Sequence, residues 1–251
     1  PRQDTMNDME VGVGQWSEPG RSGDATTASA YAGFGDLHLV VVADGARGAT
    51  PAKSAAQAAV AAVTSAFRTG SPHMSVADRL GQAFRSVHAA IQEATVGTQA
   101  EGRAGAELAA FVIEPGQVTF ARVGGGRLYV LESHGTVSFP VTASSGFAGD
   151  GSAEPDIVTR ALTLMPGDRL VLATEATART IAADIGALAH SSSPQLTAQA
   201  LVSAARRRGA RGALVAHVVE VRSEMSHRTR RPALSTLDVP MPPAIGLDGR
   251  Q

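Results

Sequence analysis

Cysteine is absent from the 251-residue sequence, and aromatic residues make up only 4% of it. Without cysteine the chain can form neither a disulfide nor a thiolate nucleophile or metal site. No apolar run approaches the roughly 20 residues that a membrane-spanning helix needs, and the polar first residues carry no signal-peptide pattern. The net charge of −1 gives no general attraction to nucleic acid or anionic lipid. We therefore expect a cytoplasmic protein that binds no nucleic acid and does not span a membrane.

Lysine is nearly absent, while alanine and glycine are abundant, which is typical of a GC-rich bacterial source. Apolar residues make up 43% of the chain and charged residues 18%, as in globular proteins. This length allows one large domain or two small ones with a sizeable core. The chain begins with Pro1 rather than methionine, which is typical of a fragment or a processed chain.

The first half of the sequence alternates weak and strong structural signals. Segments 11–14 and 28–34 have weak strand character, whereas LHLVVVA at 37–43 predicts a strand buried on both faces. Thr50 and Pro51 have the residue types of a helix start and predict a helix that ends at Gly70. Apolar residues at helical spacing predict a second helix over 76–95.

The second half reads as a β meander followed by a helix pair and a closing strand. Gly-containing turns at Pro115-Gly116 and His134-Gly135 separate apolar runs, and Pro166-Gly167-Asp168 precedes another. The expected strands are 107–114, 117–123, 124–132, 136–141, 169–174 and 213–221, and the expected helices are 176–189 and 194–208.

Helices therefore occur in pairs and do not alternate one for one with strands. This order predicts an α+β fold in which two packed antiparallel sheets are flanked by paired helices. We place this domain at 11–221, after a flexible N-terminus at 1–10. The segment 222–251 is basic and then Pro-rich, and we interpret it as a tail or linker.

Most familiar catalytic motifs are missing. Lys53-Ser54 follows Ala52 rather than the glycine of a phosphate-binding loop, and Gly124-Gly125-Gly126 leads into a strand rather than a helix. The histidines are scattered, so each has a surface or core role as its first interpretation, including His217 in an apolar strand. There is also no G-x-S-x-G nucleophile turn.

Asp44 follows the strongest strand and precedes a glycine and a helix. Taken alone, an aspartate in this position is more often a turn residue than a metal ligand. Asp168 in its Pro-Gly-Asp turn has the same interpretation.

Five segments together resemble the PPM-type (metal-dependent, 2C class) protein Ser/Thr phosphatases. ADG at 43–45 is similar to the family's V-A-D-G segment, and VGGGR at 123–127 to its V-G-D-S-R hairpin. The other matches, in the family's order, are 11–25, 162–177 and 205–221. The resemblance covers roughly 11–221 and implies the same two-sheet fold that the pattern of elements predicts.

Members of this family hydrolyse phosphoserine and phosphothreonine with two Mn²⁺ or Mg²⁺ ions. Such a pair needs several hard carboxylate oxygens close together, because the two cations repel each other. The resemblance assigns the bridging aspartate to Asp44 and the neighbouring carbonyl to Gly45. Asp24 retains one acid of the N-terminal stretch, and Glu175 replaces the aspartate of S-D-G.

Other site residues of the family are lost. Gly125 stands where G-D-S-R has its aspartate, and Gly212-Ala213 stands where the last ligand, D-N, is found. The phosphate-binding arginine falls at Pro19, with Arg21 nearby. Arg21, Arg47 and Arg127 remain candidates for phosphate or partner binding, as does Arg211, although surface solvation is the usual role of such arginines.

The pattern of losses implies a pseudophosphatase, a vestigial metal site and no expected cofactor. We expect a regulatory module that binds a phosphoprotein or a Ser/Thr kinase. The alternative is an active Mn²⁺- or Mg²⁺-dependent protein Ser/Thr phosphatase with a remodelled metal site. For Asp44 itself, the pseudoenzyme hypothesis predicts a local capping role.

Overall fold

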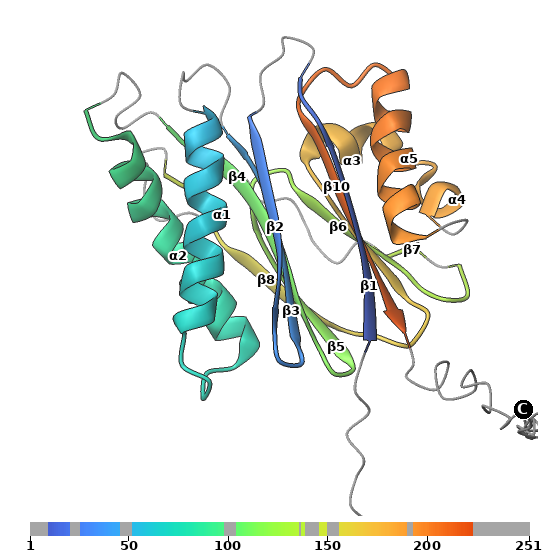
Figure 1. Cartoon of the computed structure of the whole chain (residues 1–251), viewed down its shortest axis with the longest axis horizontal. Helices are drawn as coiled ribbons and strands as arrows, with labels where there is room; N and C mark the ends of the chain where they lie inside the picture. Colours follow the sequence, from blue (N-terminus) through green and yellow to red (C-terminus); the bar gives the residue numbers. More distant parts are fainter. Residues whose placement is uncertain are drawn as a thin grey trace, which may run out of the picture.

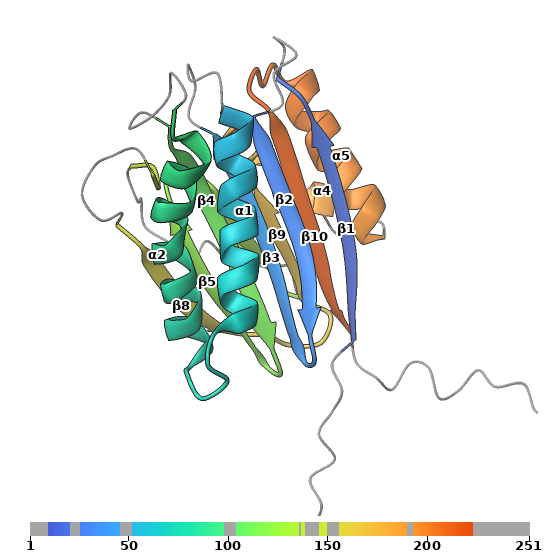
Figure 2. The same ribbon diagram turned by 60° about the vertical axis from the view of Figure 1, so that its left-hand side comes forward.

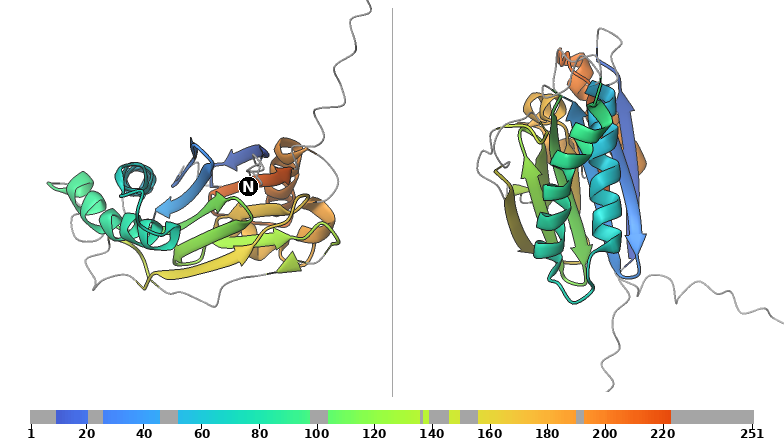
Figure 3. Two further views of the ribbon diagram at one scale, coloured as in Figure 1. Left: turned by 90° about the horizontal axis from the view of Figure 1, so that it is seen from below. Right: turned by 90° about the vertical axis from the view of Figure 1, so that its left-hand side faces the viewer.

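Two antiparallel β-sheets lie face to face, and helices cover both outer faces (Figure 1). The computed structural model describes residues 10–20, 26–45, 52–97, 104–135, 137–138, 146–149, 156–189 and 193–222. Seen from below, the order of layers is helices, sheet, sheet, helices (Figure 3). The α+β class and the sheet sandwich expected from the order of elements are therefore confirmed.

The first sheet, which we call the β10 sheet, has five strands in the order β1-β10-β9-β6-β7. All of its pairings are antiparallel. Its strands are β1 (Glu10–Glu18), β6 (Arg127–Leu131), β7 (Val137–Ser138), β9 (Arg169–Ala173) and β10 (Leu214–Arg222).

The second sheet, which we call the β3 sheet, has five strands in the order β2-β3-β4-β5-β8. It is also antiparallel throughout. Its strands are β2 (Thr27–Phe34), β3 (Leu37–Gly45), β4 (Ala106–Glu114), β5 (Gln117–Val123) and β8 (Val158–Thr163).

The helices divide between the two outer faces (Figure 2). On the β3 sheet lie α1 (Ala52–Thr69) and α2 (Val76–Thr95), which pack against each other. On the β10 sheet lie α3 (Glu175–Ile181), α4 (Ile185–Ala189) and α5 (Pro194–Arg207). None of the described helices is long and apolar enough to cross a membrane.

Local sequence explains where the helices begin. The Ser75 hydroxyl accepts a hydrogen bond from the backbone N–H of Asp78 at 3.1 Å and so caps α2. Ser193 accepts similarly from Leu196 at 3.5 Å, and Pro194 occupies the first turn of α5, where its missing N–H has no consequence.

Strand β3 shows how the continuous apolar run is used. Leu39 and Val41 belong to the core beneath α1 and α2, while Val40 and Val42 belong to the core between the sheets. A third core lies between the β10 sheet and α3–α5. Because side chains alternate along a strand, burial on both faces demands apolar residues at every position, as the sequence has.

The structure refines several predicted boundaries. The predicted helix over 176–189 is two short helices, α3 and α4, and β6 begins at Arg127, after the three glycines. Strands β1 and β10 reach one residue beyond the predicted domain limits, to Glu10 and Arg222. The expected helix start at Thr50 and Pro51 lies outside the described residues, as do 1–9 and 223–251.

Candidate functional site

Two acidic side chains face each other at the ends of the central strands of the β3 sheet. Asp44 is the penultimate residue of β3, and it is the direct cross-strand partner of Glu107 near the start of β4. Two positions further along, Val42 and Ala109 belong to the core between the sheets. Since side chains alternate, Asp44 and Glu107 also face the space between the two sheets, at its edge.

The three glycines between β5 and β6 lie against Glu107, Glu175 and Ala109, respectively. A Cβ atom at Gly124 would lie 2.7 Å from Glu107 Cγ, and one at Gly125 would lie 2.7 Å from the carboxyl carbon of Glu175. At Gly126, a Cβ would lie 2.7 Å from the Cβ of Ala109. Real side-chain atoms do not approach so closely, so the glutamates occupy the space that side chains at 124 and 125 would need.

The charged form of Glu107 is disfavoured by its surroundings. Burial raises the pKa of its carboxyl group to about 7, and the negative charges of Glu175 and Asp44 act in the same direction. A hydrogen bond from the backbone of Gly125 and the positive charge of Arg122 only partly oppose this rise. Burial and the two neighbouring acids therefore favour the protonated form of Glu107.

Arg122 contacts the backbone of the last of the three glycines. It is on β5, only 5% exposed, and its Nη1 donates a hydrogen bond to the carbonyl of Gly126 at 3.1 Å. Burial lowers the pKa of its guanidinium, with the neighbouring Arg127 acting in the same direction and Glu107 opposing. Arg122 thus fixes the glycine turn and places a positive charge beside the acids.

Asp44 is held by the neighbouring edge strand. The Thr26 hydroxyl donates to Asp44 Oδ1 at 2.7 Å, and the backbone N–H of Gly45 donates to the carbonyl of Thr26 at 2.9 Å. These contacts give Asp44 a local role. The expected cap of the following helix lies outside the described residues and stays a prediction.

Glu175 reaches the site from the β10 sheet, as the first residue of α3. Its carboxylate also lies 3.6 Å from the guanidinium of Arg179 one turn later. The preceding Thr174 is buried, and its hydroxyl lies 3.3 Å from the N–H of Val215 and 3.4 Å from the carbonyl of Ala213. Gly212 and Ala213, which precede β10 at this point, stand where the resemblance places the family's last ligand pair, D-N.

The structure brings together Asp44, Gly45 and Glu175 of the residues that sequence analysis selected, and it adds Glu107. Sequence analysis missed Glu107, whose signal in the sequence is weak: it is an acid near the start of the largely apolar strand AELAAFVIE. The remaining candidates Asp24, Arg21 and Arg47 lie outside the described residues.

The two other candidate arginines are not part of this acidic cluster. Arg127 starts β6 and has the strand parity of Tyr129, which packs in the core beneath α3–α5. Because Leu128 faces the space between the sheets, Arg127 faces the helix side. Arg211 is exposed in the turn before β10.

These residues do not fit a pair of divalent cations. Within the described part of the chain, no three acidic or histidine side chains converge closely enough to hold a metal ion. Asp44, Glu107 and Glu175 do interact electrostatically, but burial and repulsion raise the pKa of Glu107, and the Glu175 side chain lies against Gly125. A two-metal centre instead needs several ionised oxygen donors around an open volume.

Comparison with known proteins gives a consistent picture. Residues 21–215 match the sequence model of the family described as Protein phosphatase 2C. The Mycobacterium tuberculosis serine/threonine phosphatase PstP is 18% identical with a TM-score of 0.72, over 84% of this chain and 99% of that one. A PstP catalytic domain in complex with two manganese ions is 19% identical with a TM-score of 0.73, over 86% and 100%.

A third similar structure is PppA, a regulatory component of the type VI secretion system in Pseudomonas aeruginosa. It is 20% identical with a TM-score of 0.68, over 84% of this chain and 97% of that one. At these identities the structural likeness establishes the fold. A comparison with curated protein sequences found no match.

Proposed function

The chain belongs to the protein phosphatase 2C family, and from this membership we propose that it is a pseudophosphatase that acts as a regulatory, protein-binding module. Its proposed partner is a phosphoprotein or a Ser/Thr kinase. One observation carries the proposal. The Glu175 side chain fills the volume beside Gly125, the position at which the family carries an aspartate ligand.

The electrostatics of the site support the same conclusion. In a working two-metal site, carboxylates are kept ionised by the cations they bind. Here burial and two neighbouring acids push the pKa of Glu107 to about 7, and the Gly125 backbone hydrogen-bonds to it. The acids thus repel one another and are satisfied by the protein itself, whereas Gly125, Gly212 and Ala213 supply no side-chain oxygen.

The test is p-nitrophenyl phosphate hydrolysis by the full chain in millimolar Mn²⁺ or Mg²⁺. We expect no metal-dependent turnover above the protein-free rate, and no difference between the wild type and Asp44→Ala. Asp36→Ala, which removes an exposed carboxylate at the other end of β3, serves as the control. Metal-dependent turnover that is lost in Asp44→Ala and kept in Asp36→Ala would overturn the proposal.

One observation favours the alternative, an active phosphatase with a remodelled site. Asp44, Glu107 and Glu175 lie close enough to shift the pKa of Glu107, so rotation of their side chains could bring them around a single ion. This alternative predicts that Glu107→Gln and Glu175→Gln each abolish a manganese-dependent activity. The pseudophosphatase proposal predicts that there is no such activity to abolish.

A further inference from the structure

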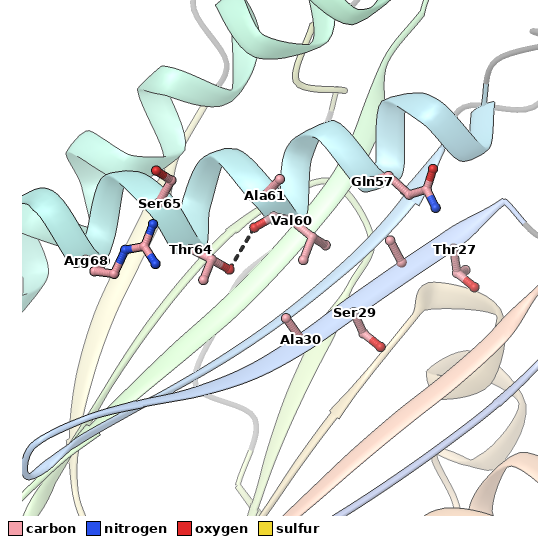
Figure 4. Close-up of a pocket in the computed structure, with 10 residues that line it drawn as sticks. Thr27, Ser29, Ala30, Gln57, Val60, Ala61, Thr64, Ser65 and Arg68 are labelled. Atoms are coloured by element: carbon pink, nitrogen blue, oxygen red, sulfur yellow. Dashed lines mark hydrogen bonds between the residues drawn. The ribbon is translucent and has the colours of Figure 1, made fainter.

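A surface groove runs between helix α1 and strand β2 (Figure 4). It has a volume of about 660 Å³ and is open to solvent. Hydroxyl and amide groups line much of it, among them those of Thr27, Ser29, Gln57 and Thr64. Arg68 is the charged residue among those that line it, at the end opposite Gln57 and Thr27.

The floor of this groove is a free strand edge. β2 is the terminal strand of the β3 sheet and pairs only with β3 among the described strands. The N–H of Gly45 bonds to the carbonyl of Thr26, which fixes the alternation of the ladder. By that alternation, the backbone N–H and C=O groups of Thr27, Ser29 and Tyr31 point away from β3, toward the free edge.

This edge lacks the usual protection against pairing with another chain. Natural edge strands commonly carry charged residues or proline, which discourage the addition of a further strand. The opposite edge strand, β8, carries Arg160, and β1 carries Glu10 and Glu18. In contrast, β2 has the sequence TASAYAGF, with neither charge nor proline over eight residues.

Helix α1 supplies a wall suited to an extended chain. Ala61 and Thr64 are small, so a strand laid along β2 could approach the helix closely. Arg68 is exposed and makes no ion pair with any of the described residues. An unpaired guanidinium at one end of an uncharged groove favours an occupant with a carboxylate at the matching position.

We propose that this groove is a docking site for an extended acidic peptide of a partner protein, which adds as a strand to the free edge of β2 and places an aspartate or glutamate against Arg68. Main-chain hydrogen bonds to Thr27, Ser29 and Tyr31 supply affinity, and the α1 wall with Arg68 supplies specificity. The other end of the groove lies at Thr27, the cross-strand partner of Asp44. A docked peptide therefore runs up to the candidate site.

The test is selection of random dodecapeptides displayed on phage against the full chain, with counter-selection on Ser29→Pro. Proline removes the outward N–H at this edge position, whereas the matched control Ser29→Ala keeps it and removes only the hydroxyl that accepts from Gln15. We expect enrichment of peptides with alternating apolar residues and at least one acid. A selected peptide should bind the wild type and Ser29→Ala, and should lose all measurable binding to Ser29→Pro.

Arg68→Glu tests the charge, with Arg160→Glu on the opposite edge strand as its matched control. Fluorescence anisotropy of the labelled peptide should show about a tenfold loss for Arg68→Glu and none for Arg160→Glu. In parallel, NMR hydrogen exchange at Thr27, Ser29 and Tyr31 should slow when the peptide is added. Circular dichroism checks that each variant is folded.

Several results would overturn the inference. One is no enrichment over the Ser29→Pro protein, and another is a selected peptide whose binding neither Ser29→Pro nor Arg68→Glu weakens. Exchange at the three amides that slows with protein concentration would identify a second copy as the occupant. Exchange at these amides that becomes faster when residues 223–251 are removed would identify that segment of the chain as the occupant.

The inference rests on the proposed protein-binding function, but the two fail separately. Manganese-dependent phosphatase activity would overturn the pseudophosphatase proposal and leave peptide binding at β2 unaffected. Absence of peptide binding would remove the groove as the docking site and leave the catalytic question as it stands.

Discussion

Gly125 shows most directly how single residues determine the chemistry of the site. Sequence comparison with the family marks it as a lost aspartate, but the sequence does not say what fills the vacated space. The structure places the carboxyl carbon of Glu175 at 2.7 Å from a Cβ at this position. Restoring a side chain at 125 alone is therefore obstructed by Glu175.

We predict that Gly125→Ala destabilises the protein by about 1–3 kcal/mol, the usual range for overpacking. In a Glu175→Gly background the same substitution should cost much less, because the obstructing side chain is gone. A double-mutant cycle from urea unfolding measures this coupling. Gly33→Ala, where a Cβ would meet nothing within 4 Å, is the control. Equal costs in both backgrounds would show that the contact with Glu175 does not cause the destabilisation.

Glu107 illustrates why part of the site could not be derived from the sequence. The family resemblance selected Asp44, Gly45 and Glu175 as candidates, because these positions align with its motifs. Glu107 matches no ligand motif, and its importance comes from the pairing of β4 with β3, which sets it opposite Asp44. Cross-strand register depends on the whole sheet, so a position-by-position comparison does not contain it.

At the scale of elements, hydrophobic periodicity was a good guide. The predicted helix over 76–95 coincides with α2, and the apolar run 37–43 forms the centre of β3. The break between α3 and α4 was missed, because TIAADIG has neither the proline nor the strong turn signal that usually ends a helix. Asp168 has its predicted turn role, since it accepts from the N–H groups of Met165 and Ser133.

Strand β10 carries an unusual buried residue. His217 was expected at the surface or in the core, and it is in the core with no exposed area. Neither of its ring nitrogens has a hydrogen-bond partner among the described residues. Burial lowers the pKa of the imidazole to about 4. The ring is therefore neutral in the folded protein, and its polar atoms are costly to bury.

We predict that His217→Leu stabilises the protein and reduces its sensitivity to acid. The unfolded histidine takes up a proton near pH 6.5, whereas the folded one does so only near 4, so stability is lost as pH falls between these values. Converted to free energy, this difference in pKa corresponds to a loss of at most about 3 kcal/mol in the free energy of unfolding.

Urea unfolding at pH 7 and pH 4.5 measures the effect, with His73→Leu in an exposed turn as the control. The wild type should lose more stability between these two values than His217→Leu does. An equal loss in the two proteins would contradict a neutral, unpartnered His217.

At the scale of the whole molecule, the fold and the proposed loss of activity have separate physical requirements. The fold agrees with the solved structures of PstP and PppA at TM-scores of 0.68–0.73, although identity is 20% or less. That fold depends on alternating apolar residues, which many sequences can supply. Two-metal chemistry depends on a few oxygen atoms, so a few substitutions are enough to remove it.

This separation gives a prediction for global stability. A ligand that binds only the folded state raises stability by RT ln(1 + [L]/Kd), or about 2.7 kcal/mol at a concentration of 100 Kd. A site that bound Mn²⁺ with a Kd of about 10 μM would therefore raise the melting temperature by several degrees in 1 mM MnCl₂. Because the acids of this chain do not fit a metal pair, we expect a shift below about 1 °C.

Differential scanning calorimetry of the wild type and Asp44→Ala, with and without MnCl₂, checks the prediction, and MgCl₂ serves as a second ion. The two proteins should respond alike, because nonspecific ionic effects act on both. A rise of several degrees in the wild type that disappears in Asp44→Ala would mean that the Asp44, Glu107 and Glu175 carboxylates rearrange around an ion. The energy of ion binding would then exceed the cost of moving Glu175 off Gly125 and ionising Glu107.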